Sequence, residues 1–162
     1  MTHDEFKKLF DHYFDTIRNY IYYRSGDQEL ATDVAQETFI RIWEKQPDDL
    51  KGNIKGLLYK IAGDIFISQI RKRKTAFKFI ALSPNDENYD ISPEQHLQYK
   101  ELNRNFEKAL SDLPDKQRTV FLMHRMDGLK YHEIAAMLGL SVKAVEKRMN
   151  IALNFIRKVL EI

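Results

Sequence analysis

The side chains best suited to chemistry lie in the C-terminal stretch 142–158, where basic and amide groups recur at helical spacing. Lys143, Lys147 and Asn150 fall nearly opposite an apolar stripe, and Arg148 flanks that stripe. In the major groove, lysine and arginine suit phosphates or guanine edges, and asparagine suits adenine. These residue types therefore indicate recognition of duplex DNA. A basic, solvated face on a packing helix is the alternative that this stretch alone leaves open.

Side-chain sets for catalysis, cofactor binding or metal binding are missing. The five histidines stand at spacings that suit no metal site, and His132-Glu133 lacks the second histidine that a zinc-protease helix requires. The sequence has no cysteine, which excludes thiolate ligands and a cysteine nucleophile. Its six glycines are scattered and form no phosphate-binding loop. We therefore expect no enzymatic activity, no cofactor and no metal.

A helix–turn–helix is expected to position the basic side chains. Gly139 supplies the left-handed backbone on which a helix can stop, and Ser141 can cap the helix that follows. Apolar residues at helical spacing precede and follow this turn. They are Tyr131, Ile134, Ala135 and Leu138 before it, and Val145, Met149, Ala152, Ile156 and Val159 after it.

Composition narrows the class of protein without naming it. A content of 43% hydrophobic and 12% aromatic residues over 162 residues is enough for one or two packed cores. The net charge of +2 is small, so the distribution of charge matters more. Positive charge gathers at 71–74 and 143–158, and acidic residues separate these two basic regions at 83–94. The absence of cysteine, of a membrane span and of an N-terminal apolar run predicts a soluble, unprocessed, cytoplasmic protein.

Helical periodicity dominates the chain, and we predict an all-α protein of two small helical domains joined by a flexible acidic linker. The first domain is expected over 1–75, the linker over 76–92 and the second domain over 93–162. A capping box formed by Thr2 and Glu5 should open the first helix, which should end near Gly26. The further helices are expected over about 28–45, 53–74, 93–111 and 114–126, before the helix–turn–helix.

The helix over 28–45 carries two distinct faces. Its apolar residues, with Phe39 and Trp43 among them, are expected to point inward, and Pro47 should stop it. The opposite face mixes acidic, amide and apolar residues, which suits docking on a basic partner helix or a merely solvated surface. The helix over 53–74 has Gly63 as a weak point and ends in four basic residues close to aromatic ones. That end suits phosphates and opened bases, or simply a solubilised helix terminus.

Three stretches in order resemble one family. Residues 33–43 (DVAQETFIRIW) are similar to the most characteristic motif of the bacterial sigma-70 sigma factors, specifically of the short extracytoplasmic-function (ECF) group. Residues 58–62 and 71–73 resemble the remainder of the same conserved region, which is the second. Residues 113–121, 127–135 and 140–148 resemble the fourth. The resemblance covers nearly the whole chain except the linker.

The resemblance implies a subunit without an active site that binds core RNA polymerase, directs it to promoter DNA and helps to melt that DNA. It also implies a partner, an anti-sigma factor that is often membrane-anchored, with no direct membrane insertion of this chain. The residues implied at the clamp helices of the largest polymerase subunit are Asp33, Gln36, Glu37, Phe39 and Trp43. Those implied at the minus-10 DNA are Leu50, in a base-capturing loop over 46–53, with Tyr59, Lys60, Arg71, Lys72, Arg73 and Lys74. Those implied at the minus-35 DNA are Ser141, Lys143, Ala144, Lys147, Arg148 and Asn150.

Some positions depart from the family pattern. Lys130 replaces the usual serine or threonine cap before Tyr131, which should weaken that helix start by about 1 kcal/mol. Asp64 and Ser68 stand where asparagine and aspartate are frequent, and Glu146 adds a negative charge to the reading helix. The competing hypothesis is a conventional helix–turn–helix regulator with an N-terminal sensing or dimerisation domain. A helical enzyme or adaptor acting on nucleic acid is a third hypothesis.

Overall fold

The described part of the chain folds into α-helices. In the computed structural model, residues 1–47, 52–72 and 93–160 are described, and this part of the chain forms seven helices and no strand. The predicted all-α class is therefore confirmed. The helices are α1 (His3–Ser25), α2 (Gln28–Lys45), α3 (Ile54–Lys72), α4 (Pro93–Asp112), α5 (Asp115–Asp127), α6 (Tyr131–Leu138) and α7 (Val142–Leu160).

Local caps fix both ends of α1. The Thr2 hydroxyl accepts a hydrogen bond from the Glu5 amide at 3.2 Å, and the Thr2 amide donates to the Glu5 carboxylate at 2.7 Å. This reciprocal pair is the predicted capping box, and the hydrogen bond with the Thr2 backbone lowers the pKa of Glu5. At the other end, Gly26 has a φ of 68°, a left-handed conformation that ends the helix.

Side-chain and backbone hydrogen bonds cap both ends of α2. The Asp27 carboxylate accepts from the Leu30 amide at 3.1 Å. At the C-terminal end, Gln46 takes a left-handed φ of 47°, and its amide donates to the Ile42 carbonyl at 3.1 Å. The Gln46 side chain donates to the Trp43 carbonyl at 2.7 Å. The helix thus stops one residue before Pro47, as predicted.

An aromatic cluster joins α1 to α2 and corrects one prediction. Phe39 is 1% exposed and packs edge-on against Phe6 and Phe10, with ring centroids 6.4 and 5.2 Å away. Trp43 packs against Phe6 at 5.1 Å, yet 40% of it is exposed. The prediction that Trp43 points inward was therefore wrong in part. The residue lies one turn beyond Phe39, beside the first turn of α1, and α1 is too short there to cover the whole indole.

The α3 helix is continuous through Gly63. This glycine is buried, and the nearest atoms to an added Cβ would be Arg24 Nη1 at 3.5 Å and the Tyr20 hydroxyl at 3.6 Å. The expected weak point therefore causes no break. At the start of α3, the Asn53 side chain accepts from the Gly56 amide at 2.9 Å. Residues 73–74, which the sequence assigned to this helix, and the predicted linker over 76–92 lie outside the described residues.

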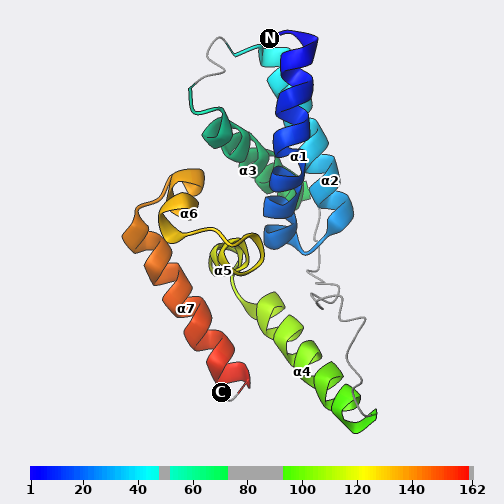
Figure 1. Cartoon of the computed structure of the whole chain (residues 1–162), viewed down its shortest axis with the longest axis vertical. Helices are drawn as coiled ribbons and strands as arrows, with labels where there is room; N and C mark the ends of the chain where they lie inside the picture. Colours follow the sequence, from blue (N-terminus) through cyan, green and yellow to red (C-terminus); the bar gives the residue numbers. More distant parts are fainter. Residues whose placement is uncertain (48–51, 73–92, 161–162) are drawn as a thin grey trace.

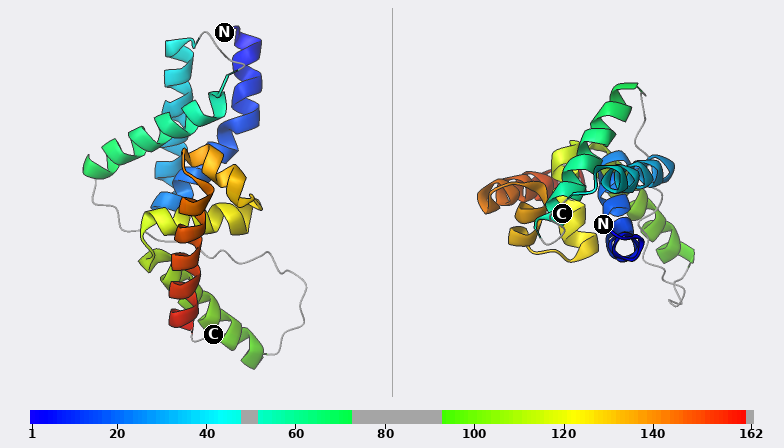
Figure 2. Two further views of the ribbon diagram at one scale, coloured as in Figure 1. Left: turned by 90° about the vertical axis from the view of Figure 1, so that its left-hand side faces the viewer. Right: turned by 90° about the horizontal axis from the view of Figure 1, so that it is seen from above.

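The second group of helices, α4 to α7, packs below the first group in Figure 1. The α4 and α7 helices lie side by side, with α5 and α6 filling the space toward α1 and α3. Figure 2 shows from two further directions that α5 crosses the C-terminal end of α1 and that α6 lies near α3. The two groups therefore contact each other directly, through α1 with α5 and α3 with α6.

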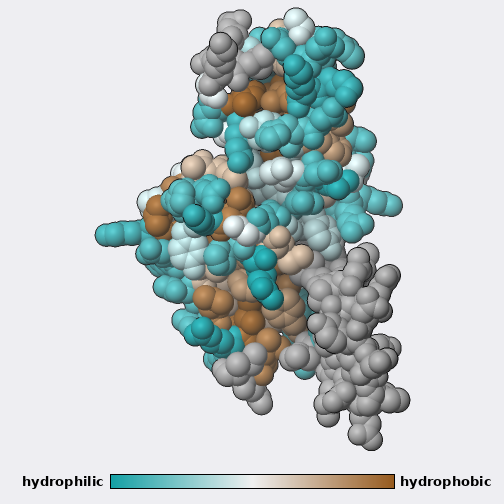
Figure 3. Space-filling model, viewed as in Figure 1, coloured by the Kyte–Doolittle hydropathy of each residue, from teal (hydrophilic) through white to brown (hydrophobic). Residues whose placement is uncertain are grey.

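The surface facing the viewer in Figure 3 is largely hydrophilic. Hydrophobic colour gathers beside α1 in the upper part and between α4 and α7 in the lower part. The buried apolar side chains form one cluster that draws on both groups of helices, from Ile17 in α1 to Ile156 in α7. Packing against this cluster orients the polar faces described next.

Candidate promoter-binding and polymerase-binding surfaces

The turn between α6 and α7 has the geometry that its sequence predicts. Gly139 takes a left-handed φ of 66°, and the Leu140 amide donates to the Ala135 carbonyl at 2.9 Å. Ser141 caps α7, because its hydroxyl accepts from the Ala144 amide at 3.1 Å. These contacts close a helix–turn–helix and fix the direction in which α7 leaves the turn.

Burial of the apolar stripe of α7 leaves the opposite face of the helix in solvent. Val145, Met149, Ala152 and Ile156 are buried. Val159, which the sequence also assigned to this stripe, is 41% exposed, whereas Leu160 is partly buried against the core. The assignment of Val159 to the buried stripe was therefore wrong, and Leu160 takes its place.

The side chains assigned to the minus-35 DNA lie along the free face of α7. Lys143, Lys147 and Asn150 are exposed, as is the capping Ser141, whereas Ala144 and Arg148 are half-buried at its edges. Glu146 is exposed among them. The arrangement offers cationic and amide hydrogen-bond donors along a single helix face, which is the form required in a major groove.

The start of α6 partly replaces its missing serine or threonine cap. The Glu133 carboxylate accepts from the Lys130 amide at 3.1 Å, which is the reciprocal half of a capping box. The Tyr131 ring also stands edge-on to the His124 ring with centroids 5.2 Å apart. The expected weakness at Lys130 is thus offset by a carboxylate near the positive end of the helix dipole.

The outer face of α2 is polar with an apolar centre. Asp33 and Gln36 are exposed, and Glu37 is half-buried and forms an ion pair with Arg41 at 3.2 Å. Ile40 is 50% exposed and Trp43 is 40% exposed. Ile40 is not among the contact residues that the family resemblance implies. An isoleucine on an otherwise polar helix face is nevertheless a sequence signal for a contact candidate.

Phe39 does not belong to this outer face. It is 1% exposed, beneath the aromatic rings of α1, so it supports the surface from inside and cannot touch a partner directly. The motif resemblance had placed it among the contact residues. Phe39 lies four residues from both Ala35 and Trp43, on the stripe of α2 that packs against α1. This position explains why its ring is buried and not part of the outer face.

The residues assigned to the minus-10 DNA divide into exposed and covered ones. Lys60, Arg71 and Lys72 are exposed on α3. Tyr59 is only 3% exposed, its ring lies tilted against that of Tyr20 with centroids 4.8 Å apart, and burial raises the pKa of its phenol. Leu50, Arg73 and Lys74 lie outside the described residues.

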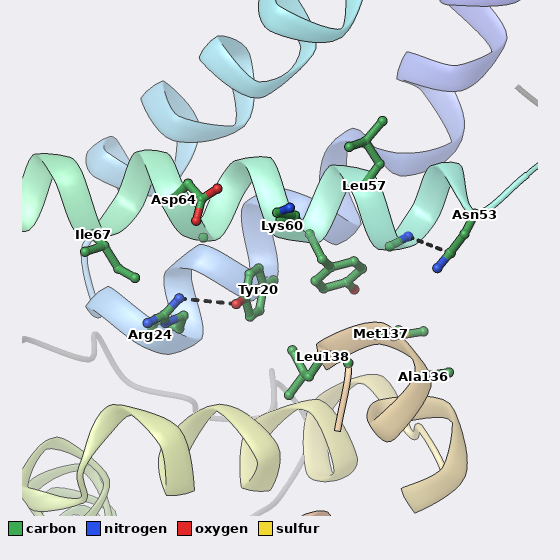
Figure 4. Close-up of a pocket in the computed structure, with 14 residues that line it drawn as sticks. Tyr20, Arg24, Asn53, Leu57, Lys60, Asp64, Ile67, Ala136, Met137 and Leu138 are labelled. Atoms are coloured by element: carbon green, nitrogen blue, oxygen red, sulfur yellow. Dashed lines mark hydrogen bonds between the residues drawn. The ribbon is translucent and has the colours of Figure 1, made fainter. Parts of the chain in front are cut away.

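A cleft separates α3 from the helix–turn–helix. Its volume is about 590 Å³, and it is lined on one side by Lys60 and Asp64 and on the other by residues 136–139. Figure 4 shows Lys60 and Asp64 on α3 with Met137 and Leu138 across the gap. The side of α3 that carries Lys60 and Asp64 therefore faces the second group of helices.

Neither a metal cluster nor a membrane span is found where the structure is described. Over residues 1–47, 52–72 and 93–160, no group of three or more histidine or carboxylate side chains could hold a metal ion. Within the same ranges, every helix is too short or too polar to cross a bilayer.

Comparison with known families identifies two regions of this chain. Residues 9–76 match the family described as Sigma-70 region 2, and residues 103–155 match the one described as Sigma-70, region 4. The first match covers α1 to α3, and the second begins within α4 and ends within α7.

Two bacterial sigma factors are similar to the chain in sequence. The ECF RNA polymerase sigma factor SigW of Bacillus subtilis is 30% identical over 167 residues, which cover 97% of this chain and 89% of that protein. The ECF RNA polymerase sigma factor SigE of Mycolicibacterium smegmatis is 30% identical over 142 residues and 84% of this chain. The matched segment spans about half of that longer protein, 54% of its length.

Two solved structures share the fold. Sigma factor RpoE of Bartonella quintana, in complex with the anti-sigma factor NepR, matches with a TM-score of 0.67 and 24% identity over 98% of both chains. CnrH, in complex with the cytosolic domain of CnrY, matches with a TM-score of 0.65 and 22% identity over 99% of this chain and 90% of that one.

Proposed function

We propose that this chain, which belongs to the sigma-70 family and to its ECF group, is the subunit that gives an RNA polymerase its promoter specificity. It binds core RNA polymerase and directs initiation at particular promoters. The observation that carries this proposal is the order of sigma region 2 and sigma region 4 along one chain. A conventional helix–turn–helix regulator is not favoured, because its N-terminal domain would have no reason to match sigma region 2.

The outer face of α2 is the proposed contact with the clamp helices of the largest polymerase subunit. Asp33 and Gln36 offer exposed polar groups, and Ile40 and Trp43 supply apolar area in the following turns of the helix. A partly exposed tryptophan beside polar residues is the composition that carries binding energy at protein interfaces. Glu37 extends this face toward Arg41.

Two basic surfaces are the proposed promoter contacts. On α3, Lys60, Arg71 and Lys72 would neutralise phosphates of the minus-10 DNA, together with residues of the neighbouring basic run. On α7, Lys143 and Lys147 would read or position the minus-35 DNA, with Ser141, Ala144, Arg148 and Asn150 around them. The two domains proposed are 1–75 and 93–162.

The proposed place of action is the cytoplasm, where RNA polymerase works and where a chain without cysteine meets no redox constraint. The chain has no catalytic role of its own in this proposal, because nucleotide addition belongs to the core enzyme. An anti-sigma factor is a further proposed partner, since the RpoE structure of the same fold is a complex with the anti-sigma factor NepR.

Reconstitution tests the function directly. The purified chain is added to sigma-free core polymerase with a promoter library, and the starts of the transcripts are sequenced. We expect a small set of promoters that share a minus-35 and a minus-10 element. A chain that binds duplex DNA tightly without the core, and starts no transcripts with it, would instead identify a conventional regulator.

Matched variants separate the two surfaces. Gln36→Ala should weaken core binding, whereas Gln28→Ala, two turns earlier on α2 and also exposed, should not. Lys147→Ala should weaken promoter recognition and leave core binding unchanged. Lys158→Ala is its control, because it removes an exposed lysine from nearly the same face of α7 about 16 Å farther along the helix.

A further inference from the structure

The C-terminal end of α2 differs from the other helix ends that take a left-handed backbone. Where the structure is described, three such ends, those of α1, α5 and α6, carry glycine, which adopts this conformation without strain. The end of α2 carries Gln46, with a φ of 47° and a ψ of 61°. A residue with a Cβ is strained in this region. Its presence here therefore indicates that the side chain has a role that glycine could not fill.

Pro47 makes the backbone of Gln46 decisive for the direction of the chain. A proline ring fixes its own φ and also restricts the residue before it. The backbone angles of Gln46 therefore set the direction in which the chain leaves α2. The chain leads from there into the loop over 46–53, which the family resemblance implies at the minus-10 DNA.

The Gln46 side chain holds these backbone angles from two sides. Its Nε2 donates to the Trp43 carbonyl at 2.7 Å, one of the last carbonyls of α2, which have no partner within the helix. Its Oε1 accepts from the Met1 nitrogen at 2.8 Å. The Gln46 amide donates in addition to the Ile42 carbonyl at 3.1 Å. One residue thus ties the end of α2 both to its own last turn and to the residues that lead into α1.

The start of α3, where the same loop ends, is held by a second side-chain cap. Asn53 accepts from the Gly56 amide at 2.9 Å through its side chain, and Figure 4 shows this bond at the start of α3. A Cβ on Gly56 would lie 2.4 Å from Asn53 Nδ2, so the glycine leaves room for the cap. Both residues that border the loop are therefore fixed by their own side chains. A segment with fixed ends loses less conformational freedom when it binds a partner.

We propose that Gln46 is a positioning residue for promoter recognition, whose side chain directs the chain after α2 toward the minus-10 DNA. The proposal rests on the proposed function, and Gln46 acts in it through the residues that follow. Its two side-chain bonds organise the end of α2 before the promoter arrives, so that less binding energy is lost in ordering it. A residue that served only to stop the helix could be replaced by glycine without effect, since glycine ends α1, α5 and α6.

Gln46→Gly separates these two roles. Glycine accepts the left-handed backbone and keeps the amide that donates to the Ile42 carbonyl, so α2 should end at the same residue. Only the bonds to the Trp43 carbonyl and the Met1 nitrogen are lost. An affinity tag at the C-terminal end leaves the Met1 nitrogen unchanged. Circular dichroism should show the same helical content as in the unchanged chain.

Asp27→Gly is the matched control. It removes the side-chain cap at the opposite end of the same helix, about 27 Å away, where Asp27 accepts from the Leu30 amide at 3.1 Å. Glycine is tolerated at this position at small cost. Any general effect of losing a cap on α2 should appear in both variants, whereas an effect on the minus-10 DNA should appear only in Gln46→Gly.

Base selectivity in reconstituted transcription is the measurement. Each chain is combined with core polymerase on a promoter library randomised in the minus-10 and minus-35 elements, and the transcripts are sequenced. Gln46→Gly should lower selectivity by about threefold or more at one or more minus-10 positions. Selectivity at the minus-35 element and binding to core polymerase should not change, because α7 and the outer face of α2 are not altered. A loss of stability alone would lower the yield from every promoter by the same factor.

The unchanged chain is measured beside both variants. If it initiates normally and Gln46→Gly keeps its minus-10 selectivity, the role of Gln46 is overturned while the proposed function stands. An equal loss of selectivity in Asp27→Gly would overturn that role as well. If the unchanged chain starts no transcripts with core polymerase, the proposed function fails, and the role of Gln46 fails with it.

Discussion

Arg24 and Asp115 form a forked ion pair between residues 91 positions apart in the sequence. Arg24 Nε and Nη2 lie 3.1 and 2.9 Å from Asp115 Oδ2. The guanidinium carbon of Arg24 lies 4.7 Å from the centroid of the Phe66 ring, and its Nη1 donates to the Tyr20 hydroxyl at 3.2 Å. Arg24 therefore ties α1, α3 and α5 together, and the two groups of helices should lose stability together when it is changed.

A double-mutant cycle should resolve this pair. The side chains of Arg24 and Asp115 are 16% and 34% exposed, so solvent screens part of their attraction. We expect a coupling energy of about 0.5–1 kcal/mol from urea unfolding of Arg24→Ala, Asp115→Ala and the double variant. Arg24→Ala alone should cost more than Asp115→Ala, because it also removes the contacts with Phe66 and Tyr20. A coupling energy of zero would mean that the pair adds nothing to stability in solution.

Phe39 and Gln36 should separate stability from binding. Phe39→Ala removes a 1% exposed ring from the aromatic cluster and should cost about 3–5 kcal/mol of unfolding free energy. Gln36→Ala, one turn earlier on the exposed face, should change stability by less than about 0.5 kcal/mol and weaken core binding. Urea unfolding and a core-polymerase pull-down measure the two effects. A stable Phe39→Ala variant that still lost core binding would return Phe39 to the contact surface.

The two glycines Gly63 and Gly139 should respond to alanine in opposite directions. Gly63 lies inside α3, and an added Cβ would make ordinary contacts at 3.5 and 3.6 Å, so Gly63→Ala should stabilise the protein by about 0.5–1 kcal/mol. Gly139 has a φ of 66°, so Gly139→Ala should destabilise it by about 1 kcal/mol although the space is open. Urea midpoints measure both. Destabilisation by Gly63→Ala would show that α3 and α1 pack more tightly than these distances allow.

The sequence predicts helix ends well, because the signals that set them are local. The capping pair of Thr2 and Glu5, the left-handed Gly139 and the cap by Ser141 each act within four residues, and each prediction is confirmed. Exposure is less predictable, since it depends on what happens to lie across from a helix. Phe39 and Trp43 share one motif and one stripe, yet only Phe39 is covered.

Contacts between the two groups of helices could not be predicted from sequence periodicity. Arg118 belongs to a recognisable motif, but no spacing rule connects it to the carbonyls of Tyr23 and Arg24, more than ninety residues earlier. The sequence indicates only a cationic residue near the start of α5. Its burial, which lowers the pKa of the guanidinium to about 10, follows from the docking of one helix on another.

Asp127 gives the contact between α1 and α5 a dependence on pH. Burial raises the pKa of its carboxyl, and the hydrogen bond from the Tyr23 hydroxyl only partly opposes this. A carboxyl whose pKa is raised in the folded state binds its proton more tightly there than in the unfolded chain. Its contribution to stability is therefore greatest below its ordinary pKa and is lost as the pH rises through the raised value.

Asp127→Asn should remove this dependence while keeping a carbonyl oxygen that can accept from Tyr23. Between pH 7 and pH 4, the stability of the unchanged protein should rise relative to that of the variant, as measured by urea midpoints at each pH. Glu107, whose pKa is also raised by burial, is present in both proteins and cancels in the difference. If the difference between the two proteins stays constant across this range, the Asp127 carboxyl keeps its ordinary pKa, and its contact with Tyr23 contributes equally at every pH.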